Sequence, residues 1–474
     1  MMAVSSSAGN NVVCPDLVAT GKGGRTNPFY LPICIIHMLP RSAVLNVVST
    51  AIGHRLMRSY TSPLPPSDRA ALATRLQKHR GESIRALTAD LAEQNTQMSD
   101  GTLGAVLALL LSEVSCPFSH FPPPGDPVSD PRTDPTNVFS LVAAAPQRCS
   151  HHHQPEGRVW SSGVHKAIAS LYLQGICHVS TPLPTASSYL GSHPRFRSIG
   201  VMGSTTSPHV PVESARSQLE LIDMMPVLYG NGLATGFPCP PALFTQIIRI
   251  NHLRAQFLAI HDNHSRIGDL SLQDRYSCAM DVLLQIKSCP IEDWALSVAF
   301  ESSSQSTAEL DGISNDPRSS GSPDFSQWQC IARIFQCAVA IYCIGSLLHD
   351  AHRAAPRPTN PEEHPTTADT PDPQTILADA RIQSRVVLLR QLRRVAGYHQ
   401  LRKFVLWPLV VAGIGAEDET TKSFIQDELR WISETMGTAS PLLARQFLKE
   451  RVWQGGLGKG EWNKMFDRAY LFAI

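Results

Sequence analysis

Apolar residues recur about every three or four positions through most long segments of this chain, and this period constrains the fold more than any other feature. The segment 242–260 illustrates it, with Leu243, Ile247, Ile250 and Phe257 following the pair Pro240-Pro241. Proline suits the first turn of a helix, and this spacing is typical of a helix that buries one face. No convincing pair of strand-like segments occurs. We therefore expect an all-α fold, a large irregular multi-helix domain with disordered Pro/Ser-rich insertions.

The 474 residues alternate between such helical segments and stretches rich in proline, serine and acidic residues. The first 25 residues are predicted to be a flexible tail, and 26–474 to form a single domain. Loop insertions are expected at about 116–157, 302–324 and 354–372. The main helices are expected at 28–47, 42–57, 67–91, 99–113, 160–171, 242–260, 328–349, 376–395, 423–435 and from Ser440-Pro441 onward.

The charge balance shows no chain-wide excess of positive charge of the kind that attracts nucleic acid or an anionic membrane. Lys and Arg total 41 against 40 Asp and Glu, giving a formal net charge of +1. The apolar runs 103–111, 331–348 and 404–416 are interrupted or shorter than the roughly 20 residues that span a bilayer. The N-terminus lacks the pattern of a secretory signal. We therefore expect a soluble protein without a membrane partner, with its cysteines in a reducing compartment.

No motif predicts a cofactor or a metal site. Cys330, Cys337 and Cys343 lie within a segment typical of a buried helix, so core thiols are expected. Cys149, the consecutive histidines 151–153 and His165 are of the types that bind zinc. However, three consecutive histidines in a proline-rich stretch cannot all face one zinc ion. The glycines of 229–236 do not match a dinucleotide fingerprint, which favours a loop.

Known catalytic motifs are also absent, so the sequence predicts no enzyme. An enzyme hypothesis would require acids such as Glu113, Asp223 and Asp281 to converge in one pocket, whereas lone acids on helices are commonly caps or solvated.

The most basic stretch lies within 381–403. Phosphate contact is one interpretation of its cationic residues. A solvated helix face is the better one, because the same segment carries an apolar stripe that must pack inward. The cations are Arg381, Arg385, Arg390, Arg393, Arg394, Arg402 and Lys403.

Bulky aromatic residues, prolines and glycines recur at the boundaries of the C-terminal helical segments. Pro408 follows Trp407 in an apolar stretch, where we expect it to kink a buried helix. We interpret seven of these residues as a structural signature of packing and not as a reactive site: Trp407, Pro408, Gly413, Trp453, Trp462, Phe466 and Asp467.

Five stretches in order give the chain a family resemblance. They are Leu39-Pro40 with 51–54, the stretch 100–113, 236–240 with 250–253, 407–409 with 412–413, and Trp462 with 466–470. Taken together, they resemble the fungal-specific transcription factor domain, the helical regulatory region that usually follows a zinc binuclear cluster. That cluster reads DNA with six cysteines in two CxxC-containing halves, and no CxxC occurs in this sequence.

The resemblance implies a nuclear regulator of RNA polymerase II transcription in a fungus, serving a secondary-metabolite or catabolic gene cluster. Its implied partners are the transcriptional machinery or other transcription factors, with a small-molecule effector and a homodimer as further options. DNA contact would be indirect, or would use an N-terminal zinc cluster missing from this sequence. The alternative is a non-nuclear helical scaffold that binds partners through its packed helices.

Overall fold

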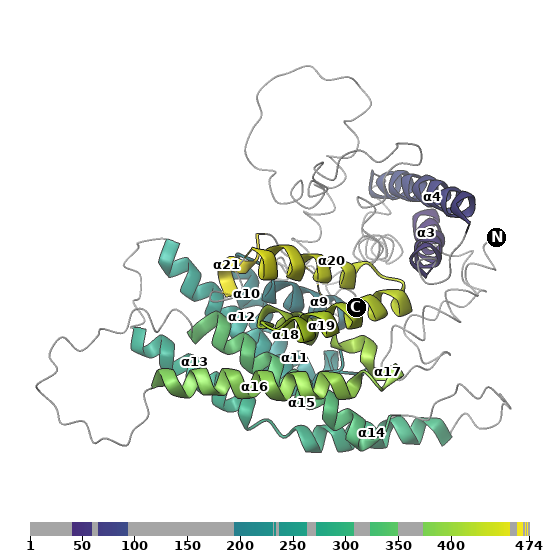
Figure 1. The fold of residues 1–474 in the computed structure, drawn as a ribbon. Coiled ribbons are helices and arrows are strands. Elements are labelled where there is room, and N and C mark those ends of the chain that lie inside the picture. Colours follow the sequence, from purple (N-terminus) through teal and green to yellow (C-terminus); the bar gives the residue numbers. More distant parts are fainter. Residues whose placement is uncertain are drawn as a thin grey trace, which may run out of the picture. The chain divides into compact units, whose positions relative to one another are not determined.

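The computed structural model describes residues 40–58, 65–92, 194–230, 232–233, 237–262, 272–307, 323–348, 373–455, 462–467, 470 and 472. Helices without strands make up the secondary structure of these residues, which confirms the all-α prediction (Figure 1). By contacts, the chain divides into two compact units, 1–197 with 430–443 and 474, and 198–429 with 444–473. The single domain over 26–474 stays a prediction.

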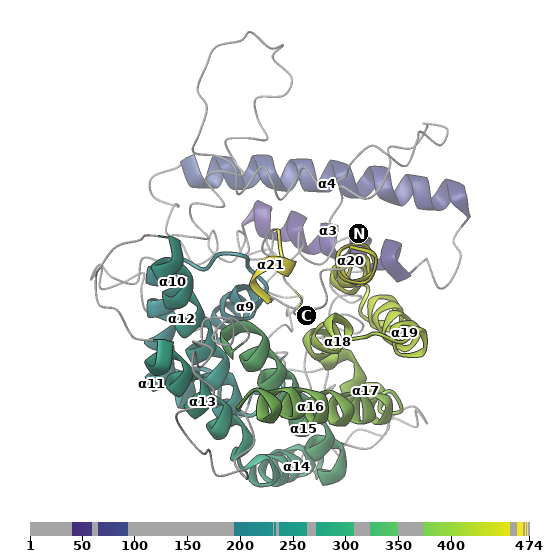
Figure 2. The same ribbon diagram turned by 60° about the vertical axis from the view of Figure 1, so that its left-hand side comes forward.

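The first unit is built on an antiparallel helix pair, α3 (Arg41–Arg58) and α4 (Pro66–Ala92), which lie along each other in Figure 2. Their apolar faces meet at Val48, Ile52, Leu56, Leu72 and Leu76. Burial of these side chains supplies the main stabilisation of the pair.

Residues 430–443 of the same unit connect two helices, the end of α19 (Glu419–Met436) and the start of α20 (Ser440–Phe447). Ala439 and Leu442 pack on the α3–α4 core. Gly437 follows α19 with φ +63°, a left-handed conformation that favours glycine after a helix end. A Cβ at this position would lie 2.3 Å from Cδ2 of His54, so both conformation and space require glycine.

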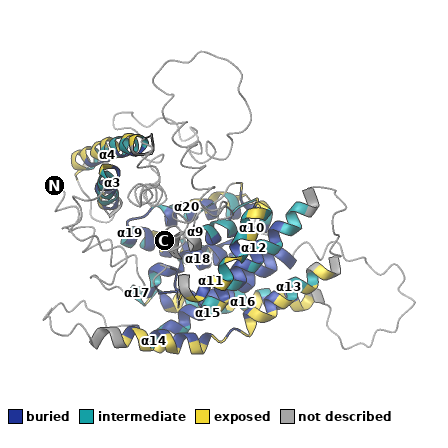
Figure 3. Ribbon diagram, turned by 180° about the vertical axis from the view of Figure 1, so that it is seen from behind, coloured by how far each residue is buried: buried dark blue, intermediate teal, exposed yellow. Residues whose placement is uncertain are grey.

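The second unit surrounds α15 (Phe325–Cys343), which continues as the π-helix η5 (Ile344–Leu348). The Asp324 carboxylate caps α15 by accepting a hydrogen bond from the backbone N–H of Gln327 at 2.9 Å. α15 packs against five helices, and Figure 3 shows the deep burial around it: α12 (Pro241–Asp262), α13 (Leu272–Lys287), α14 (Ile291–Thr307), α16 (Pro373–Val395) and α18 (Leu406–Ile414).

Shorter elements complete this unit. They are α9 (Pro194–Thr205), which begins in the first unit, α10 (Val212–Leu219), α11 (Leu221–Leu228), α17 (His399–Arg402), the 3-10 turn η6 (Lys403–Val405), the π-helix η7 (Leu448–Gln454) and α21 (Trp462–Met465).

The stretch Phe325–Leu348 is long and apolar enough to cross a membrane by length and composition. However, 94% of its most apolar window is buried inside the protein. Packing in the core therefore accounts for its apolar character.

Several predicted helix positions are confirmed to within a few residues, namely those of α3, α4, α12, α15, α16, α19 and α20. The predicted loop at 302–324 starts too early, because α14 continues to Thr307 and buries Ser302. The helices expected at 28–47, 99–113 and 160–171 lie mostly or wholly outside the described residues, as do the loop at 116–157 and nearly all of 354–372.

Pro408 does not kink the middle of a helix, so that expectation is wrong. The chain passes through the 3-10 turn η6, and α18 then begins at Leu406, which places Pro408 in the first turn. Amides in the first turn of a helix have no intrahelical carbonyl partner, so the missing proline N–H costs little there.

Candidate functional site: a buried arginine and its partners

Arg254 of α12 is completely buried and is the centre of a polar cluster in the second unit. Its Nε donates to Oδ1 of Asn463 at 2.5 Å, and one terminal nitrogen donates to the carbonyl oxygens of Ser204 and Thr205 at 2.9 and 3.5 Å. The other terminal nitrogen donates to the Ser207 carbonyl. One side chain thus connects α12 with the end of α9 and with α21.

The end of α9 explains why an arginine can be buried here. The last carbonyl groups of a helix have no intrahelical donor, and the helix dipole makes this end partially negative. The guanidinium group of Arg254 satisfies these carbonyls with its fixed set of donors. Among the residues that the structure describes, no carboxylate pairs with it. The backbone therefore takes the place of a counter-ion.

Thr205 brings two predicted signature residues to the same place. Its Oγ1 accepts a hydrogen bond from Nε1 of Trp407 at 3.0 Å, and its carbonyl accepts one from Nε1 of Trp462 at 2.7 Å. Both indoles are buried, so these bonds satisfy N–H groups that water cannot reach. The Tyr342 ring contacts both indoles, with its centroid 6.1 Å from that of Trp407 and 5.0 Å from that of Trp462.

Asn251, one helical turn before Arg254, extends the cluster. It accepts a hydrogen bond from the Tyr342 hydroxyl at 2.7 Å and donates to the Val201 carbonyl at 2.9 Å and to Gln218 at 3.2 Å. Burial raises the pKa of Tyr342, although nearby Arg254 opposes the shift. The phenol is therefore held protonated as a hydrogen-bond donor.

Gly413 and Trp453 mark a close approach of α18 and η7. Nε1 of Trp453 donates to the Gly413 carbonyl at 2.9 Å. A Cβ on Gly413 would lie 2.5 Å from Cδ1 of Leu448, which is closer than real contacts allow. Space and not backbone conformation therefore favours glycine here, because an added Cβ would force the Leu448 side chain to shift.

Phe466 and Asp467 belong to a C-terminal cluster. The Phe466 ring stacks on Phe447 at a centroid distance of 5.0 Å. Asp467 forms an ion pair with Arg451 at 3.1 Å and accepts a hydrogen bond from the Tyr470 hydroxyl at 2.9 Å. The structure thus places the signature residues at helix contacts, while their role as a family signature stays a prediction.

The acids of the enzyme hypothesis are not brought together among the described residues. Asp223 of α11 and Asp281 of α13 are both exposed, and Glu113 lies outside the described residues. No group of three potential metal ligands occurs in the part of the chain that the structure describes.

The cysteines of α15 are buried free thiols, as predicted. Burial raises the pKa of Cys330 and Cys337 to about 11 and that of Cys343 to about 12. Two described glycines of the stretch 229–236 have conformations typical of a turn, with φ +55° at Gly230 and +86° at Gly232. Both interpretations from the sequence are confirmed for these residues.

The basic stretch is only partly a solvated face. Arg390, Arg393 and Arg394 are exposed, whereas Arg381 and Arg385 are half-buried. Arg402 forms two hydrogen bonds of 2.7 Å with the Glu428 carboxylate, a bidentate ion pair. Lys403 is buried, with Nζ 5.0 Å from the centre of the Phe404 ring.

Sequence reasoning noted the stretch 250–253 but missed Arg254 as the central residue. The available signal was a cationic residue three positions after Asn251, on a helix whose neighbouring positions are apolar. That spacing puts both side chains on one helix face. Their partners lie elsewhere in the sequence and could not be inferred from it.

The hydrogen bonds of this cluster hold helices against one another. The comparisons agree with a regulatory helical domain. The model of the fungal specific transcription factor domain matches residues 195–463, more than half of the chain, and this range contains Thr205, Arg254, Trp407 and Trp462.

One similar protein is the phomenoic acid biosynthesis cluster-specific transcriptional regulator of Leptosphaeria maculans (strain JN3 / isolate v23.1.3 / race Av1-4-5-6-7-8). The two are 24% identical over 443 residues, which cover 92% of this chain and 66% of the relative. The chain thus spans less than two thirds of the length of that relative. No solved structure matches the chain. With more than half of its length matched by the family model, the chain belongs to the fungal-specific transcription factor domain family.

Proposed function

We propose that the chain is a nuclear regulator of RNA polymerase II transcription that controls a secondary-metabolite gene cluster. The family match over 195–463 carries the proposal. The cluster-specific role of the Leptosphaeria maculans relative supports the finer part, the kind of genes that are controlled. In this proposal the domain works through protein or small-molecule contacts and performs no catalysis.

The buried cluster gives this proposal a physical basis. Arg254 joins three segments through hydrogen bonds to backbone carbonyls and to Asn463. A rearrangement that breaks this connection would leave several buried polar groups unsatisfied, which is costly. The domain is thus suited to presenting a fixed surface to the transcriptional machinery, to another transcription factor or to a second copy.

The location of a tagged chain expressed from its own promoter tests the proposal against the scaffold alternative. Nuclear accumulation together with altered transcripts in a deletion strain supports the regulator. Cytoplasmic retention together with an unchanged transcript profile favours the scaffold.

The route to DNA is tested separately by translating the genomic sequence upstream of Met1 in all frames. An upstream exon with six appropriately spaced cysteines and basic residues supports direct contact through a zinc cluster. Its absence supports recruitment by a partner.

A further inference from the structure

Two outer helices of the second unit, α14 and α16, carry exposed apolar side chains at matching spacing. Leu296 and Phe300 of α14 are 62% and 73% exposed, and Ile382 and Val386 of α16 are 59% and 51% exposed. In each pair the residues are four positions apart, which places them on one face about 6 Å apart along the helix axis. Exposed large apolar side chains grouped in this way often mark a contact surface.

The charges around these two pairs have opposite signs. α14 contains Glu292, Asp293 and Glu301 but neither lysine nor arginine. Arg390, Arg393 and Arg394 are exposed at the C-terminal end of α16. Asp293 and Arg390 are both exposed, and neither forms an ion pair with another described residue. The two faces are therefore complementary in both apolar spacing and charge.

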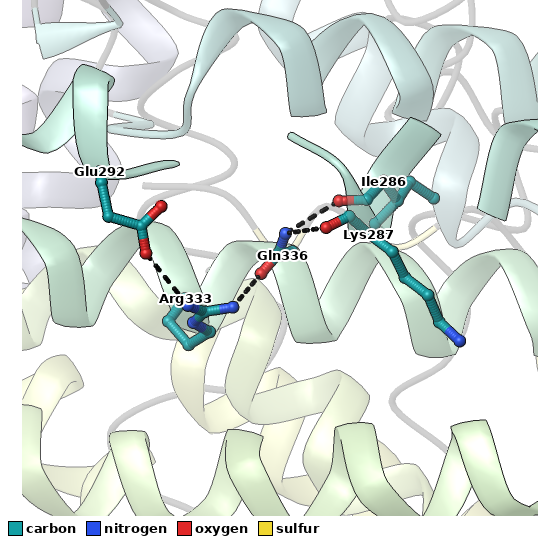
Figure 4. A network of polar contacts seen from close by, with 5 residues as sticks. All are labelled: Ile286, Lys287, Glu292, Arg333 and Gln336. Atoms are coloured by element: carbon teal, nitrogen blue, oxygen red, sulfur yellow. Dashed lines mark hydrogen bonds and ion pairs between the residues drawn. The ribbon is translucent and has the colours of Figure 1, made fainter. Parts of the chain in front are cut away.

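Internal contacts fix the acidic end of α14. Arg333 of α15 bonds to Glu292 at 3.2 Å and to Oε1 of Gln336 at 2.8 Å, while Nε2 of Gln336 donates to the Ile286 carbonyl at 2.9 Å (Figure 4). Arg333 partly neutralises Glu292, so Asp293 is the acid with most to gain from an external cation. The same network holds this end of α14 beside α13, so the acidic face is preformed.

We propose that α14 of one copy docks antiparallel on α16 of a second copy, so that the chain associates with itself through these two faces. In this alignment Leu296 lies against Val386 and Phe300 against Ile382. The acidic start of α14 then meets Arg390 and Arg393. Asp379, the acid on α16, lies opposite the neutral residue Ser303, so no two acids face each other there. This places the N-terminal end of one helix dipole beside the C-terminal end of the other, which is favourable. The inference rests on the protein-contact part of the proposed function and specifies its surface.

The register allows a charge-exchange experiment on the purified full chain by sedimentation velocity over a concentration series. The wild-type chain is expected to associate as concentration rises. Asp293→Arg and Arg390→Glu, each alone, place like charges opposite one another and are expected to weaken association roughly tenfold or more. Asp427→Arg and Lys287→Glu change exposed residues on α19 and α13 by the same charge and are expected to leave association unchanged.

Mixing the two weakened variants gives the sharpest outcome. Asp293→Arg and Arg390→Glu together restore opposite charges at every α14–α16 contact between unlike copies, so the mixture is expected to associate more tightly than either variant alone. The double variant Asp293→Arg/Arg390→Glu is expected to associate as well. Leu296→Glu is expected to abolish association, and unchanged helical circular dichroism verifies that it folds.

A wild-type chain that stays monomeric throughout the concentration series overturns the proposal. So does an associated chain that none of the face variants affects, or a variant mixture that fails to associate. These outcomes concern self-association alone. They leave the transcriptional function to be judged by its own tests of location and transcripts.

Discussion

Nε of Arg254 donates a 2.5 Å hydrogen bond to Oδ1 of Asn463, although the two residues are 209 positions apart in the chain. The same guanidinium group satisfies carbonyls at the end of α9. A single buried side chain therefore ties the beginning of the second unit to its C-terminal helix.

Replacing Arg254 with methionine keeps an unbranched side chain but removes every donor. Because the carbonyls around it are buried, we expect the free energy of unfolding to fall by about 3 kcal/mol or more. Urea unfolding followed by circular dichroism measures the change. Arg430→Met is the matched control on the exposed face of α19 and is expected to stay within about 0.5 kcal/mol of wild type. Equal midpoints for both variants would contradict the role of the buried arginine.

The bond between Trp407 and Thr205 can be isolated by a double-mutant cycle. Trp407→Phe removes the indole donor, and Thr205→Val removes the acceptor, which lies 3.0 Å away. We expect the two losses to be non-additive, with a coupling energy of about 1 kcal/mol. Strictly additive changes in unfolding free energy would show that the bond contributes nothing measurable.

Gly413→Ala tests the close approach of α18 and η7. The added Cβ would lie 2.5 Å from the Leu448 side chain, so we expect a loss of about 1 to 3 kcal/mol. Leu448→Ala in the same chain makes room for the new Cβ, so we expect Gly413→Ala to cost less in the Leu448→Ala background than in the wild-type chain.

The matched control is Gly81→Ala in α4, where nothing lies within 4 Å of the new Cβ. Alanine is the better helix former, so this control is expected to gain about 0.5 to 1 kcal/mol. Thermal melting compares the variants, and a melting temperature for Gly413→Ala at or above that of wild type would contradict the steric argument.

The thiols of α15 give a pH dependence whose sign follows from burial. Burial raises the pKa of Cys343 from the ordinary value of 9.0 to about 12, and those of Cys330 and Cys337 to about 11. Between these values the unfolded chain has lost thiol protons that the native chain keeps, so stability falls as pH rises through this window. The contribution of these thiols to stability is fully present below about pH 9.

Thermal melting between pH 8 and 11 checks this contribution by comparing the wild type with Cys343→Ala. The variant is expected to lose less stability over the same interval, since it lacks the thiol with the highest pKa among the three. Identical pH dependence in the two chains would contradict a contribution from Cys343.

The sequence predicted helices best where a strong apolar period meets a clear start signal. α12 begins at Pro241 as Pro240-Pro241 suggested, and α20 begins at Ser440. The predicted loop start at Ser302 was wrong, because a polar run resembles a loop in the sequence even where tertiary contacts bury part of it in a helix. The position of Pro408 within its helix was predicted wrongly for a similar reason, since only the structure shows that η6 ends at Val405 and α18 begins at Leu406.

The buried cluster could be predicted only in part. Trp407 and Trp462 stood out as bulky residues near helix ends, but their common acceptor, Thr205, lies more than 200 positions earlier. Arg254 resembles any cation on an amphipathic helix until its partners are known. The identity of these partners depends on contacts between distant segments, and the apolar periodicity of the sequence does not reveal such contacts.

Genome-wide transcript levels test the central claim most directly. Isogenic strains would carry the wild-type gene, a deletion, Arg254→Met, or Asp427→Arg as the surface control, with protein levels measured alongside. We predict that transcripts of one contiguous gene cluster change in the deletion strain, and that Arg254→Met reproduces this change while Asp427→Arg does not. A deletion strain whose transcripts all match those of wild type, under conditions in which the protein is present, would contradict the account.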